Sequence, residues 1–325
     1  MNRKVGILCC AALLFSGAQQ LHLRAAKPAP LHLSQDVPAA PSPAGDQAVF
    51  KSNTDLVLLR VNVFDGRSDA VAELPRSAFT VVEDGKPQEI TFFEAGDVPV
   101  AVGLVVDNSG SMITRRKMVV AGGTAFAESS HPDDEVFTII FNENIRAGLP
   151  DSVAFTQSRP LLMASLMRFP SGGLTALYDA VIAGLDHLQE ASLQKHVLVV
   201  LSDGDDNASQ HSLQDMLHRA ARSDALIYTI WTGDLTASPG KRDVLRKLAN
   251  ANGGVAYFPK SEERVVMAFK EIAENIRRGY SIGYVPINGA RDGEYRRVKV
   301  GVRVPGRNLT VRVRDGYAAA GGESD

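Results

Sequence analysis

One apolar stretch of this chain ends in a run of oxygen-bearing side chains. Residues 98–106 are mostly apolar, and Asp107, Ser109 and Ser111 follow at alternate positions. Hard divalent cations such as Mg²⁺ prefer oxygen ligands, and a strand that leads directly into a helix start holds such side chains in fixed positions. This segment therefore predicts one part of a metal site.

Two distant segments have the same character. Residues 198–201 form a second apolar run that ends at Ser202 and Asp203, and a Gly-rich segment places Thr175 just before a helical pattern. The loops that follow parallel strands meet at one edge of a sheet, so both segments can reach Asp107. A structural alternative stays open, because Asp and Ser are also common caps that satisfy the free amides of a helix start.

Together these residues resemble the metal-ion-dependent adhesion site of the von Willebrand factor type A domain. That family's Asp-x-Ser-x-Ser stretch, later Thr and still later Asp match Asp107, Ser109, Ser111, Thr175 and Asp203. The resemblance implies that these five residues surround one divalent cation, directly or through water, and leave one position open. Mg²⁺ is the favoured ion, with Mn²⁺ and Ca²⁺ as alternatives, and the open position implies a protein partner that presents Asp or Glu.

The elements expected from residue 98 onward alternate between strands and helices, which is typical of a parallel sheet with helices on both faces. Strands are predicted over residues 100–106, 135–141, 196–201, 225–231 and 255–258, with 145–149 as an antiparallel edge strand. Helices are predicted over residues 112–129, 157–168, 176–189, 212–223, 241–251 and 261–278. The fold class is therefore α/β, a doubly wound, mostly parallel sheet of the von Willebrand A or Rossmann-like type, over residues 98–279.

The flanking segments, residues 53–97 and 280–318, show the alternation typical of antiparallel strands. Neither has enough strands for a stable sandwich of its own, so we expect them to pair into one small β module into which the α/β domain is inserted. Motifs in both flanks, at residues 79–86, 280–284 and 314–317, resemble secreted bacterial proteins related to the von Willebrand A domain.

The N-terminus has the pattern of a secretory signal peptide over residues 1–18, with a basic start, a short apolar stretch and small residues. A retained anchor is the alternative. An Ala- and Pro-rich linker is expected over residues 19–52, and a disordered tail over 319–325. The predicted location is outside the cytoplasm: periplasm, cell surface or extracellular space. No integral membrane span is expected after signal cleavage.

The chain has 325 residues and a net charge of −2, which gives no electrostatic reason to expect a nucleic-acid partner. The oligomeric state stays open. Asp205 and Asp206 are more simply helix-capping acids than ligands of a second ion, and Asp179 either orients a ligand of the site or is an ordinary acid in a first helix turn. Trp231 is expected in the core, and the Arg- and Lys-rich strand near residue 296 is expected to be the exposed face of a sheet.

The favoured function is a secreted or envelope-associated protein that uses its cation to capture an acidic side chain, and no enzymatic activity is expected. One alternative is an envelope scaffold in which the cation only stabilises the fold and the β module binds the partner. A hydrolase of the haloacid dehalogenase type is disfavoured, because Ser109 stands where that class requires a second acid.

Overall fold

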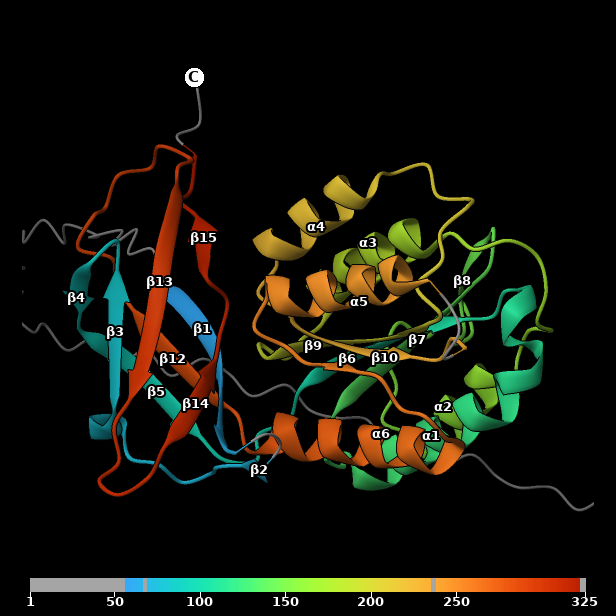
Figure 1. Ribbon diagram of the computed structural model, residues 1–325, viewed down its shortest axis with the longest axis horizontal. Helices are drawn as coiled ribbons and strands as arrows, with labels where there is room; N and C mark the ends of the chain where they lie inside the picture. The colour runs from blue at the N-terminus through green and yellow to red at the C-terminus, as the bar shows by residue number, and fades with distance from the viewer. Residues whose placement is uncertain (1–55, 67–68, 235–237, 322–325) are drawn as a thin grey trace, which may run out of the picture. The chain divides into compact units, whose positions relative to one another are not determined.

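The computed structural model describes residues 56–66, 69–234 and 238–321. The predicted signal peptide (1–18) and linker (19–52) lie outside the described residues, as does most of the tail. Within residues 52–325, which form one compact unit, the chain builds a six-stranded mixed sheet with helices on both faces and two antiparallel sheets (Figure 1). The predicted fold class is confirmed.

The six-stranded sheet lies between two layers of helices. Its strands are β6 (Ala101–Asp107), β7 (Glu135–Phe141), β8 (Ile145–Ala147), β9 (His196–Ser202), β10 (Leu226–Trp231) and β11 (Ala256–Tyr257). The helices are α1 (Arg116–Ser129), α2 (Arg159–Leu166), α3 (Leu177–His187), α4 (Leu213–Arg222), α5 (Pro239–Ala251) and α6 (Glu262–Arg277), with short 3₁₀ helices η2 (Gly110–Arg115) and η3 (Leu188–Glu190). Helices α1, α2 and α6 pack on one face, and α3, α4 and α5 on the other (Figure 1).

The strand order is β11-β10-β9-β6-β7-β8, and all pairs are parallel except β7 with β8. All seven residues of β6 and all seven of β9 are buried, because helices cover both faces of a parallel sheet. After β6 the chain moves to β7 on one side, and later returns to β9 on the other side. The crevice beyond the carboxyl ends of β6 and β9 is therefore the topological switch point, where open α/β sheets bind ligands.

The helices begin where local chemistry satisfies their first amides. The Ser212 side chain accepts from the Asp215 backbone N–H and the Asp215 carboxylate accepts in return from Ser212, so α4 starts with a capping box. At α6 the Ser261 side chain accepts from the Arg264 backbone N–H, and two acids, Glu262 and Glu263, lie in the first turn. The helix predicted over residues 112–129 differs at its start, because residues 112–115 belong to the 3₁₀ helix η2.

The flanking strands pair across the α/β insertion. They are β1 (Val57–Asp65), β2 (Asp69–Ala70), β3 (Phe79–Glu83), β4 (Lys86–Gln88), β5 (Ile90–Ala95), β12 (Tyr280–Tyr284), β13 (Tyr295–Val302), β14 (Leu309–Arg312) and β15 (Gly316–Ala318), with 3₁₀ helix η1 (Arg76–Ala78). One sheet has the order β14-β1-β12-β5, the other β15-β13-β3-β4, and apolar residues from both sheets share one core.

One expectation for the basic strand is wrong. Arg296 is 4% exposed and pairs with Asp292 at 2.6 Å, whereas the sequence suggested that all its basic residues face solvent. Alternation along β13 is the reason: Arg297 and Lys299 face outward, so Arg296 shares the inner face with Val298.

Candidate metal centre

The carboxylate of Asp107 is buried at the switch point. Asp107 is the last residue of β6 and is 1% exposed. Its Oδ1 accepts a hydrogen bond from the Ser109 backbone N–H (3.0 Å), and its Oδ2 accepts one from Ser202 Oγ (2.7 Å). These bonds fix the orientation of the carboxylate and leave lone pairs available to a ligand.

The electrostatics of Asp107 favour a nearby cation. Burial raises the pKa of the Asp107 carboxyl, hydrogen bonds from Ser109 and Ser202 oppose that rise, and the negative charge of Asp203 adds to it. Neither Asp107 nor Asp203 forms an ion pair with any residue that the structure describes. Lys241 pairs with Asp205 and its charge also acts on Asp203, but the Asp107 and Asp203 carboxylates still repel each other, and a divalent cation between them would relieve that repulsion.

The two serine hydroxyls of the motif lie together and are not used as helix caps. Ser109 Oγ and Ser111 Oγ are 3.2 Å apart. Ser109 occupies the N-cap position of η2, yet its side chain makes no capping hydrogen bond. The Ser109 hydroxyl therefore does not act as a helix cap, although the Asp107 carboxylate accepts the Ser109 backbone N–H, and both hydroxyls stay available as oxygen ligands.

Thr175 lies in a loop that backbone hydrogen bonds join to the other two. Its carbonyl accepts from Asn207 N (2.9 Å) and Ala208 N (3.0 Å), in the loop that follows Asp203. In the same segment, Gly173 O accepts from Gly110 N at 3.1 Å. The three predicted segments thus meet at one edge of the sheet, although no hydrogen bond joins the Thr175 hydroxyl to the other four residues in the described part of the chain.

Asn108 and Arg116 form hydrogen bonds with the loop that carries Thr175, and the sequence analysis did not single them out. Asn108 Nδ2 donates to Pro170 O (2.7 Å), and Ser171 Oγ donates to Asn108 Oδ1 (2.5 Å). Arg116 Nη1 donates to the same Asn108 oxygen (3.2 Å), and its Nη2 donates to Met167 O (2.8 Å). The second residue of the Asp-x-Ser motif therefore positions the loop that carries Thr175.

The other acids near the site have structural partners. Asp206 Oδ2 accepts from Tyr178 N at 2.9 Å in the first turn of α3, and Asp205 pairs with Lys241 at 2.8 Å. Asp179 accepts from the backbone N–H groups of Gln210 and His211. Hydrogen bonds from backbone N–H groups and ion pairing therefore account for all three acids.

Trp231 belongs to the core, as predicted, and also supports the site. Its side chain is 1% exposed, and its indole Nε1 donates to the backbone oxygen of Asp203 at 3.3 Å. The Arg242 guanidinium lies 4.9 Å from the centre of the ring.

In the described residues, no group of three or more His, Cys, Asp or Glu side chains has a metal-binding arrangement, so the candidate site depends on its three hydroxyls.

Replacement of Ser202 with Ala is expected to weaken Mn²⁺ binding about tenfold. Ser202 Oγ is the donor to Asp107 Oδ2 and also accepts from Gly204 N at 3.0 Å, so its loss frees the carboxylate to rotate. Calorimetric titration with Mn²⁺ measures the effect. Ser192→Ala, on the surface beside Glu135, is the control; equal affinities in both variants would contradict this role of Ser202.

No protein-family model matches the sequence, and no curated protein matches it. Solved structures that resemble the chain include a von Willebrand factor type A protein from Catenulispora acidiphila, with 15% identity, 83% of this chain and 76% of that one covered, and a TM-score of 0.49. Another is the von Willebrand domain of the type V pili tip protein Mfa5 from Porphyromonas gingivalis, with 13% identity, coverage of 55% and 95%, and a TM-score of 0.46.

The PilB minor pilin from Streptococcus sanguinis is 15% identical over 56% of this chain, with a TM-score of 0.45, and the match spans 62% of the pilin's length. Because these TM-scores are below 0.5, the fold assignment rests on the strand order described above.

No helix among the described residues is long and apolar enough to cross a bilayer.

Proposed function

We propose that this protein is a binding protein that holds one divalent cation at Asp107, Ser109, Ser111, Thr175 and Asp203. The observation that carries the proposal is the buried carboxylate of Asp107, which accepts two hydrogen bonds. It lies close to the Asp203 carboxylate and to the hydroxyls of Ser109 and Ser111. Oxygen ligands of this kind suit Mg²⁺, and also Mn²⁺ or Ca²⁺.

The bound cation would supply a strong electrostatic contact for an acidic side chain of a protein partner. Hydrogen bonds from Ser109 and Ser202 withdraw charge from Asp107, so the site's own carboxylates only partly neutralise the ion. Ser111 is exposed whereas Asp107, Ser109 and Thr175 are buried, so the site opens to solvent on the Ser111 side. A Glu or Asp of the partner would approach from there.

Capture rather than catalysis is the proposed role. Ser109, not an acid, stands two positions after Asp107, and its hydroxyl faces Ser111. A hydroxyl there supplies no general acid for a leaving group.

We also propose export to the periplasm, cell surface or medium, on the N-terminal sequence pattern alone.

The metal half of the proposal is tested by titration of the full chain with Mg²⁺ and Mn²⁺. Thr175→Ala is expected to bind Mn²⁺ at least tenfold more weakly without loss of fold, because it removes one oxygen ligand and leaves the backbone bonds to Asn207 and Ala208. Unchanged affinity would show that Thr175 is not a ligand. Circular dichroism of the variant is the folding control.

The partner half is tested by capture from native envelope or medium on immobilised protein, in Mg²⁺ and in EDTA. Capture that requires both Mg²⁺ and Thr175 supports the proposal. Capture that survives EDTA, while the melting temperature falls, would instead support a scaffold whose cation is structural and whose β module binds the partner.

A further inference from the structure

Large apolar side chains are exposed around the candidate metal centre. Among the described residues between 98 and 279, five such side chains are exposed: Ile113, Ile145, Met167, Leu174 and Met267. Ile113 is 59% exposed and lies in η2, two residues after Ser111. Leu174 is 54% exposed and directly precedes Thr175. Single exposed apolar groups are common on protein surfaces, whereas a cluster of them indicates an interaction surface.

The sheet register brings Ile145, which is 38% exposed, to the same edge. Asp107 lies opposite Phe141 in β7, and Phe141 lies opposite Ile145 in β8. Because neighbouring strands are about 4.8 Å apart, the backbone of Ile145 is about 10 Å from that of Asp107. Residues two positions apart in an extended peptide are about 7 Å apart, so a large side chain two positions from a metal-bound acid reaches Ile145.

Hydrogen bonds hold the loop that exposes Leu174. Its backbone N–H donates to Glu143 Oε2 at 2.9 Å, and Asn142 Nδ2 donates to Gly172 O at 3.0 Å. Gly173 has φ +83°, and a Cβ there would displace the Glu143 carboxylate from its bond to Leu174. Leu174 is therefore held in its exposed position, and a partner that contacts it loses little loop entropy on binding.

The charged groups of this rim favour a partner with a single acid. Glu143 is exposed and forms no ion pair within the described chain, so a second acid of the partner would lie near its negative charge. Nearby basic side chains are engaged otherwise: Arg116 donates to backbone oxygens, and the Arg146 guanidinium lies over an aromatic ring. Arg115 lines a separate pocket that Glu262 also lines.

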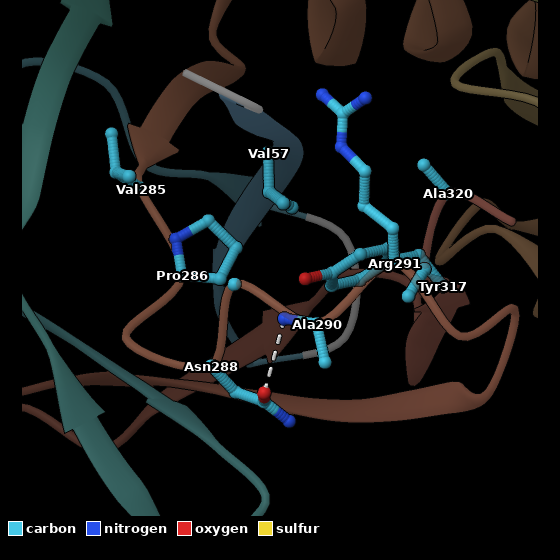
Figure 2. Close-up of a pocket in the computed structure, with 10 residues that line it drawn as sticks. Val57, Val285, Pro286, Asn288, Ala290, Arg291, Tyr317 and Ala320 are labelled. Atoms are coloured by element: carbon cyan, nitrogen blue, oxygen red, sulfur yellow. Dashed lines mark hydrogen bonds between the residues drawn. The ribbon is translucent and has the colours of Figure 1, made fainter. Parts of the chain in front are cut away.

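The exposed apolar side chains of the β module indicate no comparable site. One of them, Val285, lines a pocket of about 320 Å³ (Figure 2). The Asn288 side chain in this pocket accepts from Ala290 N, and Arg291, its charged lining residue, also has an interaction partner (Figure 2). This pocket therefore offers no free charge to recognise a ligand, in contrast to the metal edge.

We propose that the partner's metal-binding Glu or Asp lies in an extended segment with large apolar residues two positions away, which pack against Ile113, Leu174 and Ile145. The inference rests on the function proposed above and specifies the chemistry of the partner. In an extended segment, side chains two positions apart lie on the same face, so the acid and its apolar neighbours face the metal edge together. The apolar contacts bury surface on both molecules and exclude water around the acid.

The test measures the binding of four blocked peptides to the immobilised full chain by surface plasmon resonance, in Mg²⁺ and in EDTA. The peptides are Leu-Gly-Glu-Gly-Leu, Gly-Gly-Glu-Gly-Gly, Asp-Gly-Glu-Gly-Asp and Leu-Gly-Gln-Gly-Leu. In Mg²⁺ the first is expected to bind at least about tenfold more tightly than the other three, because only it combines one acid with two apolar side chains.

The outcomes separate this inference from the function on which it rests. Equal Mg²⁺-dependent binding of the Leu-flanked and Gly-flanked Glu peptides, or tighter binding of the Asp-flanked one, would overturn the inference and leave metal-dependent capture standing. If no Glu peptide binds in Mg²⁺, or if the Gln peptide binds as well as its Glu counterpart, both the inference and the proposed function are wrong.

Variants locate the apolar contact. Leu174→Ser is expected to weaken binding of the Leu-flanked peptide at least about fivefold, and to leave the affinity for the Gly-flanked peptide and for Mn²⁺ within about twofold. Ile287→Ser is the matched control, because Ile287 is an exposed apolar residue of the β module; it should bind like the wild type. Undiminished binding of the Leu-flanked peptide by both Leu174→Ser and Ile113→Ser proteins would show that the apolar contact is not at this edge.

Discussion

Replacement of Asp203 with Asn is expected to lower Mn²⁺ affinity about 100-fold and, at the same time, to raise the melting temperature of the metal-free protein. Burial raises the pKa of Asp107 and the negative charge of Asp203 adds to that rise, so the two carboxylates repel each other when no cation is present. Asn removes that repulsion but is a poorer ligand, and its side-chain oxygen still accepts the bond from Asp205 N.

The fall in Mn²⁺ affinity and the rise in melting temperature have opposite effects on the protein, and together they distinguish a metal-binding acid from a structural one. A purely structural Asp203 would lower the melting temperature when replaced, with or without metal. Asp205→Asn is the matched control, because Asp205 lies two residues further on and pairs with Lys241; it should leave Mn²⁺ affinity within about twofold. Calorimetric titration and thermal unfolding in EDTA measure the two effects, and a fall in both quantities for Asp203→Asn would refute the assignment.

Lys195 is expected to contribute a rise of about 2 kcal/mol to the free energy of unfolding between pH 8 and pH 10. Burial, then the positive charge of Arg60, lower the pKa of Lys195 from 10.5 to about 8, against smaller opposing effects of Glu94, Asp134 and Asp97. Over this interval the unfolded chain keeps a proton that the folded chain releases. Stability therefore increases with pH.

Lys195→Met is expected to remove this pH dependence, since it removes the titrating group. Tyrosines with raised pKa values, Tyr228 and Tyr257 among them, lower stability from about pH 9 upward, where unfolded tyrosine begins to ionise, so the Lys195 contribution is the difference between the wild type and Lys195→Met at each pH. Urea unfolding at pH 7.5, 8.5 and 9.5 measures the slope. A slope that persists in Lys195→Met would mean that another group is responsible.

Local patterns in the sequence were enough to predict the main sheet. The apolar run at residues 135–141 is the strand Glu135–Phe141, and the short run after it is the antiparallel edge strand β8. Strands that are buried on both faces are continuously apolar, so the sequence alone is enough to predict them. The expected helix at residue 112 begins instead as a 3₁₀ helix, which residue periodicity does not distinguish from an α-helix start.

Only part of the candidate site could be predicted from the sequence. Asp107, Ser109 and Ser111 are neighbours in the chain, so their spacing carries the information. Ser202 and Arg116 support the site through contacts with residues 95 and 53 positions away, which no local pattern reveals. Lys195 likewise differs from a surface lysine only through the elements folded around it.

The pairing of β1 with β12 has a consequence for biosynthesis. Val57 lies opposite Tyr284, and β5 also pairs with β12, so two strands near the start of the described chain wait for a partner that leaves the ribosome more than 180 residues later. Until then their hydrogen-bonding edges are open to other chains, which favours aggregation. A nascent or prematurely terminated polypeptide that stops before residue 280 therefore needs chaperone protection, even though its inserted α/β segment is already complete.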